Sequence, residues 1–103
     1  MCGRFTLAKN AKQLAEEIPD LPAEPRLTPR YNIAPSQPVA AWVRDPVPRM
    51  EVFTWGLIPP WAKDPSFASH CINARAETLA EKAAYKVAYR RKRCLIPADG
   101  WIE

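Results

Sequence analysis

The stretch VAAWVRDPVPRMEVFTWG, residues 39–56, decides the fold class because it predicts a pair of strands. Residues 39–44 and 50–56 are rich in β-branched and aromatic side chains, which favour strands. The segment between them, DPVP at residues 45–48, carries two prolines and predicts a hairpin-like connection. We therefore expect the two strands to lie side by side.

The segments before and after this hairpin alternate between helical and extended patterns. Residues 7–18 place apolar side chains on one helical face, and Pro19 ends the pattern. Six prolines between residues 19 and 38 predict an extended segment that lies on a surface or lines a cleft, with a disordered linker as the alternative. Thr78, with Glu81 three residues later, predicts the capping box of a second helix that runs to about Arg90.

Two short strands are predicted near the end of the chain. Residues 94–97 are mostly apolar, and Asp99-Gly100 is a turn signal before a strand at residues 101–103. The sequence offers no partner for that last strand. Strands and short helices together predict an α+β fold, and the unpaired strand predicts that residues 1–103 are the N-terminal part of a single domain whose C-terminal half is absent.

The composition is that of one small globular domain. Of 103 residues, 48% are hydrophobic and 25% are charged, which excludes wholesale disorder and any collagen-like or coiled-coil repeat. No apolar run approaches the length that spans a bilayer, and the first residues do not resemble a signal peptide. We expect a cytoplasmic protein, nucleoid-associated if bacterial, with no membrane partner.

The three cysteines, Cys2, Cys71 and Cys94, form no CxxC pair and are odd in number. Free thiols are therefore expected rather than disulfides. With His70, the single histidine, they could form a Cys₃His zinc site, but their spacing matches no zinc knuckle or ribbon. We expect no metal and no other cofactor.

The charge balance is mildly basic, with a formal net charge of +4. Four basic residues run together at residues 90–93. This run has two explanations, which are cations at the negative pole of a helix dipole or a site for phosphates. The helix end is the favoured explanation.

Cys2 has the most distinctive chemistry in the chain. Once Met1 is removed, the α-amine and the thiol of Cys2 sit on adjacent carbons. An α-amine with a pKa of about 7.7–8.0 is partly neutral near pH 7 and can attack an aldehyde, after which the thiolate can close a thiazolidine ring. Alternatively the thiol is a peptidase nucleophile with its own amine as base, or Cys2 is an accidental, buried terminal residue.

Two polar residues are candidates for assisting this chemistry. Glu103 could move protons to and from a Schiff base, or it could be an edge-strand carboxylate. Asn73 could orient an intermediate without competing for protons, or it could be a turn residue.

Arginine and tryptophan side chains are candidates for binding a nucleic acid. Arg4 and Arg75 could grip phosphates through bidentate hydrogen bonds, or they could be surface charges. Trp55, Trp61 and Trp101 could stack on unpaired bases. Core packing is favoured for Trp55 and Trp101.

Five blocks of sequence stand out along the chain. They are MCGRF at residues 1–5, RYNIAP at 30–35, WGLIP at 55–59 with Trp61 beyond it, INARAET at 72–78, and RCLIPADGWIE at 93–103. In this order they resemble the SOS response-associated peptidase (SRAP) family. The resemblance runs from the first residue to the last.

This resemblance implies an α+β fold with a curved, barrel-like, mostly antiparallel sheet and flanking short helices, here incomplete. It implies covalent capture of abasic sites in single-stranded DNA by the N-terminal cysteine in the DNA damage response, with autoproteolytic removal of Met1. The full-length protein is expected to be a monomer. Carried over by motif, Cys2 is the nucleophile, Asn73 holds the intermediate and Glu103 assists proton transfer. The implied DNA contacts are Arg4, Asn32, Trp61 and Arg75.

The chain departs from the family in its length. Members are about twice as long, and a catalytic histidine in their second half has no counterpart here, because His70 lies outside its motif context. Three interpretations therefore remain, namely a DNA-lesion crosslinker, a thiol peptidase, and an inactive fragment of such a protein. The aminothiol, the arginines and the Trp61 loop favour the first.

Overall fold

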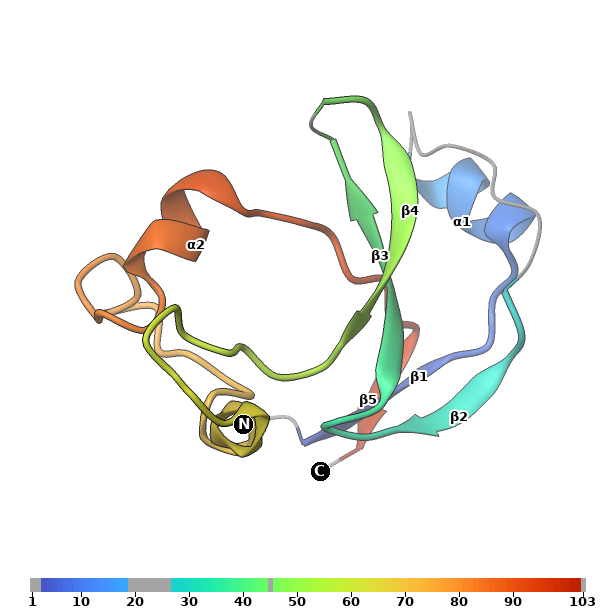
Figure 1. Ribbon diagram of the computed structural model, residues 1–103. Coiled ribbons are helices and arrows are strands. Elements are labelled where there is room, and N and C mark those ends of the chain that lie inside the picture. Colours follow the sequence, from blue (N-terminus) through green and yellow to red (C-terminus); the bar gives the residue numbers. More distant parts are fainter. Residues whose placement is uncertain (1–2, 19–26, 45, 103) are drawn as a thin grey trace.

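The chain folds into two antiparallel sheets with short helices (Figure 1). A computed structural model describes residues 3–18, 27–44 and 46–102. The elements are, in chain order, β1 (Arg4–Leu7), α1 (Ala11–Glu17), β2 (Arg30–Ile33), β3 (Pro38–Val43), β4 (Arg49–Thr54), the 3₁₀ helix η1 (Pro65–His70), α2 (Lys86–Arg91) and β5 (Gly100–Ile102). One sheet has the order β2-β1-β5, and the other pairs β3 with β4. The α+β class is confirmed, and the strands of the described residues form no closed barrel.

The hairpin predicted at residues 39–56 is confirmed by β3 and β4. The two strands pair without interruption from Pro38 opposite Thr54 to Val43 opposite Arg49. Both faces of β3 are buried, because Val39 and Ala41 point to one side and Trp42 to the other. Asp45, in the predicted connection, lies outside the described residues.

The prediction that the last strand has no partner is wrong. β5 pairs antiparallel with β1, with Arg4 opposite Ile102 and Phe5 opposite Trp101. The sequence pattern assigned Leu7 to a helix and so concealed β1. Two strands at opposite ends of a chain leave no local signal of their pairing, because register depends on tertiary packing.

Both predicted helices are shorter than the sequence indicates. α1 begins at Ala11 rather than at residue 7, because Asn10 and Gln13 form a capping box there. Residues 76–85 form mainly turns, so the second helix begins after Tyr85 rather than at Thr78. α2 buries no side chain, and a short helix without packing is only marginally stable. Within the described ranges, no helix is long and apolar enough to cross a membrane.

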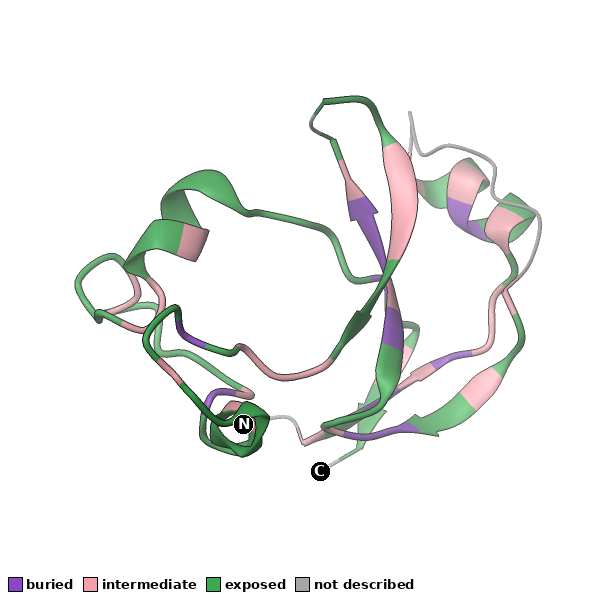
Figure 2. Ribbon diagram, viewed as in Figure 1, coloured by how far each residue is buried: buried purple, intermediate pink, exposed green. Residues whose placement is uncertain are grey.

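The hydrophobic core lies among the strands and α1 (Figure 2). Its buried cluster consists of Phe5, Leu7, Leu14, Ile33, Val39 and Trp42. The segment that carries η1 and α2 contributes little to it. Between residues 55 and 98, all of which are described, only Pro59, Cys71 and Pro97 are buried.

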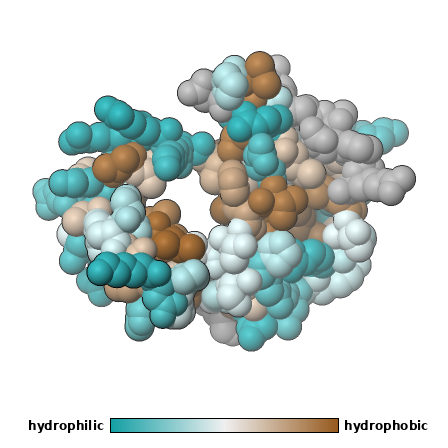
Figure 3. All heavy atoms as spheres, in the orientation of Figure 1, coloured by the Kyte–Doolittle hydropathy of each residue, from teal (hydrophilic) through white to brown (hydrophobic). Residues whose placement is uncertain are grey.

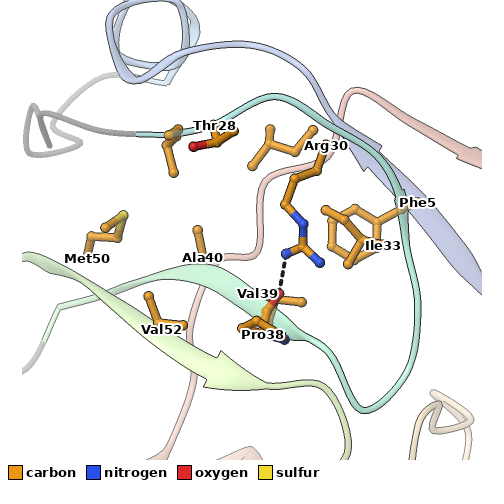
Figure 4. A pocket seen from close by; sticks show the side chains of 11 residues that line it. Phe5, Thr28, Arg30, Ile33, Pro38, Val39, Ala40, Met50 and Val52 are labelled. Carbon is orange, nitrogen blue, oxygen red and sulfur yellow. Dashed lines mark hydrogen bonds between the residues drawn. The ribbon is translucent and has the colours of Figure 1, made fainter.

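A mainly apolar cavity of about 210 Å³ adjoins this core, lined by side chains from β1, β2, β3 and β4 (Figure 4). Arg30 lines it together with Ile33 and Met50. The guanidinium of Arg30 donates hydrogen bonds to the carbonyl oxygen of Pro38 and to Oε1 of Gln37. This charge therefore stabilises the turn between β2 and β3.

Candidate functional site

Two predicted catalytic residues, Cys2 and Glu103, lie outside the described residues. Their described neighbours along the chain are Gly3, just before β1, and Ile102, the last residue of β5. Because Ile102 lies opposite Arg4, these two ends of the described chain lie on neighbouring strands. The other candidate site residues stand on β2 and in the segment between β4 and α2.

Arg4 and Asn32 are brought together on adjacent strands. Nη1 of Arg4 donates a hydrogen bond to Oδ1 of Asn32 at 3.0 Å, and both side chains are exposed. Strand side chains alternate between faces, so Arg4 points away from the face on which Phe5 and Ile33 are buried. The pairing of β1 with β2 thus holds an exposed arginine and an exposed amide at a fixed separation.

Trp55 connects this sheet to the loop that carries Asn73. Its ring packs on Phe5 with ring centroids 5.5 Å apart, and its Nε1 donates a hydrogen bond to the carbonyl oxygen of Ile72 at 3.0 Å. The backbone of Trp55 also accepts a hydrogen bond from the Ser36 amide and donates one to the Gln37 carbonyl oxygen. The core packing predicted for Trp55 is confirmed.

Gly56 permits a close approach of the chain next to Trp55. Its φ of +134° lies in a region that favours glycine. A Cβ at this position would lie 3.0 Å from both the Cβ and the carbonyl oxygen of Ala68 in η1. The next amide, Leu57, donates to the carbonyl oxygen of Cys71 at 3.0 Å, so residues 55–57 and 71–72 are held together.

Asn73 is exposed, and its backbone is fixed by a residue that sequence reasoning missed. The hydroxyl of Tyr85 donates a hydrogen bond to the carbonyl oxygen of Asn73 at 3.0 Å. Burial raises the pKa of Tyr85, and the neighbouring Cys71 raises it further, so the phenol remains a protonated donor at neutral pH. No short-range pattern indicates this contact, because the two residues are 12 apart in the sequence.

The other predicted DNA contacts stand on exposed loops. Trp61 is 54% exposed, and Arg75 is also exposed. Trp101 is 69% exposed at the edge of the described sheet, so the prediction that it packs in the core is wrong. The structure therefore joins Arg4 directly to Asn32 and links the Asn73 loop to β1, while Trp61 and Arg75 extend from separate loops.

The two described cysteines differ in exposure, and the histidine packs on a neighbouring ring. Cys71 is buried and Cys94 is exposed, and both are free, as predicted. Although the Cys94 residue is exposed overall, the protein partly desolvates its thiol, which raises the pKa of that thiol and disfavours the thiolate. The ring of His70 packs edge-on against Phe67 at the end of η1. Across residues 3–18, 27–44 and 46–102, no group of three or more His, Cys, Asp or Glu side chains is arranged to hold a metal ion.

Comparison with known proteins assigns the whole chain to one family. Residues 1–103 match the family model described as SOS response associated peptidase (SRAP). The chain belongs to the SRAP family. It is 44% identical over 106 residues to "Abasic site processing protein YoqW" of Bacillus subtilis (strain 168), and 36% identical over 109 residues to "Abasic site processing protein YedK" of Escherichia coli (strain K12). Both alignments cover 100% of this chain and 47% of the relative, so the chain spans about half the length of these curated relatives.

The five blocks that resemble the SRAP family meet in one network of contacts. Four of them are joined by the pairs Arg4–Asn32, Phe5–Trp55 and Trp55–Ile72. The fifth block supplies β5 and Asp99, whose carboxylate accepts hydrogen bonds from the Thr6 hydroxyl and the Ala8 and Lys9 amides. In the sequence, Asp99 is recognisable only as a turn signal, because its hydrogen-bond partners lie 90 to 93 residues earlier in the chain.

Proposed function

We propose that this SRAP chain takes part in the covalent capture of abasic sites in single-stranded DNA. The observation that carries the proposal is the similarity of the whole chain to relatives named abasic site processing proteins. The aminothiol that Cys2 forms after loss of Met1 supports it, because this group reacts with the aldehyde of a ring-opened abasic sugar.

The proposed reaction uses the α-amine and the thiol of Cys2 in turn. The neutral amine attacks the aldehyde carbon, water leaves and a C=N bond forms. The sulfur then adds to the same carbon and the thiol proton passes to the nitrogen, which closes the thiazolidine ring. Atoms and electrons balance without an oxidant or a reductant.

Glu103 is assigned the proton transfers of this reaction, and Asn73 is assigned the orientation of the intermediate. Support for a site near Cys2 comes from the pairing of Arg4 with Ile102, since Cys2 and Glu103 are within two residues of these positions along the chain. Support for Asn73 comes from Trp55, which binds the preceding residue, Ile72, and packs on Phe5 in β1.

The DNA strand is assigned to exposed residues of β1 and of two separate loops. Arg4, held by Asn32, and Arg75 would contact phosphates, and the exposed ring of Trp61 would stack on a base. These contacts suit a single strand, because stacking requires an unpaired base.

A thiol peptidase activity of Cys2 is the second candidate, and the description of the matched family as a peptidase favours it. Its substrate would be the Met1–Cys2 bond, and hydrolysis of that bond frees the amine needed for capture. Intact-mass measurement of the protein should show loss of Met1. A protein that retains Met1 and still forms the adduct would contradict the thiazolidine mechanism.

Incubation with single-stranded DNA carrying one abasic site, followed by denaturing electrophoresis, tests the capture proposal. The protein that carries this chain should form an SDS-resistant adduct, and Cys2→Ala should abolish the stable species because its amine alone gives only a reversible Schiff base. Cys71→Ala and Cys94→Ala are matched controls that should leave adduct formation unchanged, since internal cysteines have no adjacent free amine. An undiminished, heat-stable adduct in Cys2→Ala would refute the proposal.

A further inference from the structure

The positive charge of the chain is concentrated in residues 75–93. This segment holds seven basic and two acidic residues, a net charge of +5, whereas the whole chain carries +4. All seven basic side chains are exposed, namely Arg75, Lys82, Lys86, Arg90, Arg91, Lys92 and Arg93. None of them forms an ion pair with another residue in the described part of the chain. In the space-filling view, hydrophilic side chains surround a small apolar patch over α2 (Figure 3).

A favourable helix end explains only part of this cluster. Arg90 and Arg91 lie in the last turn of α2, where cations complement the negative pole of the helix dipole. Lys86, however, is the first residue of α2, and Lys82 precedes the helix. The positive pole disfavours cations at that end, so these two lysines need another explanation.

Lys82, Lys86 and Arg90 form a row along one side of this segment. The Lys86 amide donates to the Lys82 carbonyl oxygen at 2.9 Å, so helical spacing already begins at Lys82. Residues four apart then share a face, about 6 Å apart along the axis. Like charges at this spacing destabilise a helix, and α2 has no buried side chain to offset the effect. The row is therefore unfavourable for the isolated chain and becomes favourable when an extended anion neutralises it.

The row begins beside the candidate site. Tyr85, which precedes α2, donates its hydroxyl hydrogen bond to the backbone of Asn73. This contact holds α2 against the loop that carries Asn73 and Arg75 (Figure 1). Arg93, in contrast, folds back on α2, with its guanidinium carbon 4.2 Å from the centre of the Tyr89 ring. Its Nε donates a hydrogen bond to the Tyr89 carbonyl oxygen.

We propose that Lys82, Lys86 and Arg90 bind the sugar–phosphate backbone of the DNA strand that flanks the lesion. The identification of the polyanion as DNA rests on the proposed function. Because the row presents only charges, it neutralises phosphates without reading bases. Its contribution to affinity is therefore independent of DNA sequence and of the abasic site itself.

Fluorescence anisotropy with undamaged, labelled single-stranded DNA over a series of salt concentrations tests this surface. Each phosphate contact to a single strand contributes about 0.7 to the slope of log affinity against log salt. The triple variant Lys82→Gln/Lys86→Gln/Arg90→Gln should flatten the slope by about 2 and weaken binding at low salt by at least roughly tenfold. The matched triple Lys12→Gln/Arg44→Gln/Lys63→Gln removes the same charge from exposed positions elsewhere. It should change the salt slope and the affinity at low salt much less.

Equal affinity and slope in the two triple variants would overturn the proposal. The charge-preserving triple Lys82→Arg/Lys86→Arg/Arg90→Lys should bind like the unaltered protein. Should the glutamine triple unfold, as circular dichroism would show, each single glutamine variant should still flatten the slope by about 0.7, and unchanged slopes in all three would overturn the proposal.

Adduct formation separates this proposal from the capture reaction. At protein concentrations well above the dissociation constant, the glutamine triple at Lys82, Lys86 and Arg90 should capture abasic DNA to the same yield as the unaltered protein, because Cys2 is intact. Cys2→Ala should bind undamaged DNA normally and form no stable adduct. If the unaltered protein forms no adduct but the glutamine triple binds undamaged DNA more weakly, the proposed function is contradicted and the DNA contact of Lys82, Lys86 and Arg90 is supported. If adducts form normally and the glutamine triple binds undamaged DNA like the unaltered protein, only the proposed contact of these three residues is overturned.

Discussion

At the scale of single residues, Asp99 stabilises the contact between the start of β5 and the segment after β1. Its Oδ1 accepts from the Thr6 hydroxyl at 2.5 Å, and its Oδ2 accepts from the Ala8 amide at 2.6 Å and the Lys9 amide at 3.0 Å. The Thr6 hydrogen bond, with smaller contributions from the two amides and the Lys9 charge, lowers the pKa of Asp99. The carboxylate form is therefore the one that the folded state prefers.

Replacement of Asp99 should destabilise the fold in a pH-dependent way. Asp99→Ala should lower the free energy of unfolding by about 1–2 kcal/mol at pH 7, a modest value because the group is exposed to solvent. The folded pKa is depressed, so this contribution is present above the unfolded pKa of about 3.9 and is lost as the pH falls through the folded pKa. Urea unfolding at pH 7 and pH 3 measures it, with Glu16→Ala on the exposed face of α1 as control. An equal effect of Asp99→Ala at both pH values would contradict this role.

Gly56 should not tolerate a side chain. Gly56→Ala combines an unfavourable φ with the close approach to Ala68, and we expect a loss of about 1–3 kcal/mol in the free energy of unfolding. Gly3→Ala is the matched control, because no atom lies within 4 Å of a Cβ built there. Thermal unfolding of both variants measures this loss. Equal unfolding midpoints for Gly56→Ala and Gly3→Ala would contradict the prediction, because they would show that the loop accommodates a Cβ without loss of stability.

Sequence motifs indicate several candidate site residues but not the contacts that hold them. Arg4, Asn32 and Asn73 stand in recognisable blocks, and the structure adds a hydrogen bond between the first two that the motifs do not predict. Tyr85 and Asp99 escaped because their partners are distant in the sequence, and a hydrogen bond to a backbone group leaves no complementary residue type to recognise. The positions of Cys2 and Glu103 lie outside the described residues, so their roles stay predictions.

At the scale of elements, the β3–β4 hairpin was predictable because both strands carry a strong local pattern and are joined by a short connection. β1 and β5 were not predictable as a pair, since each is only a few residues long and its register is set by the other. The second helix is shorter than its sequence pattern predicts, because helix propensity and a capping pattern do not extend a helix that has no buried face.

Trp55 should act on the Asn73 loop through its indole N–H. Trp55→Phe retains a ring against Phe5 but removes the donor to Ile72, so we expect a loss of about 1 kcal/mol and faster amide exchange at Leu57, which bonds to Cys71. Adduct formation should slow while binding of undamaged DNA changes little. Trp55→Ala, which also removes the ring packing, should cost about 3–5 kcal/mol. Unchanged exchange at Leu57 in Trp55→Phe would mean that the indole bond does not hold the loop.

At the scale of the whole molecule, the buried cluster and most of the proposed DNA contacts lie in different parts of the chain, although Arg4 and Asn32 stand on strands. The buried cluster comes from the strands and α1. Residues 55–98 bury few side chains, and they carry Trp61, Asn73, Arg75 and the row of Lys82, Lys86 and Arg90. The two parts are joined by the Phe5–Trp55 packing and by the bridge between Trp42 and Leu95. Segments with few buried contacts open locally at low cost, so we expect the loops to adjust to DNA while the sheets stay fixed.

This separation predicts which substitutions act independently on the binding of undamaged single-stranded DNA. Arg4→Ala should flatten the log–log salt slope by about 0.7, because one phosphate contact is lost. Trp61→Ala should weaken binding by about 1–3 kcal/mol with an unchanged slope, since stacking releases no counterions. Arg4 stands on β1 and Trp61 on a separate loop, so the double variant should be additive within about 0.5 kcal/mol. Arg4→Ala/Asn32→Ala should instead be non-additive, because these side chains share a hydrogen bond. Anisotropy titrations measure all four variants, and a flattened slope in Trp61→Ala or additivity for the Arg4–Asn32 pair would contradict this division of the DNA contacts.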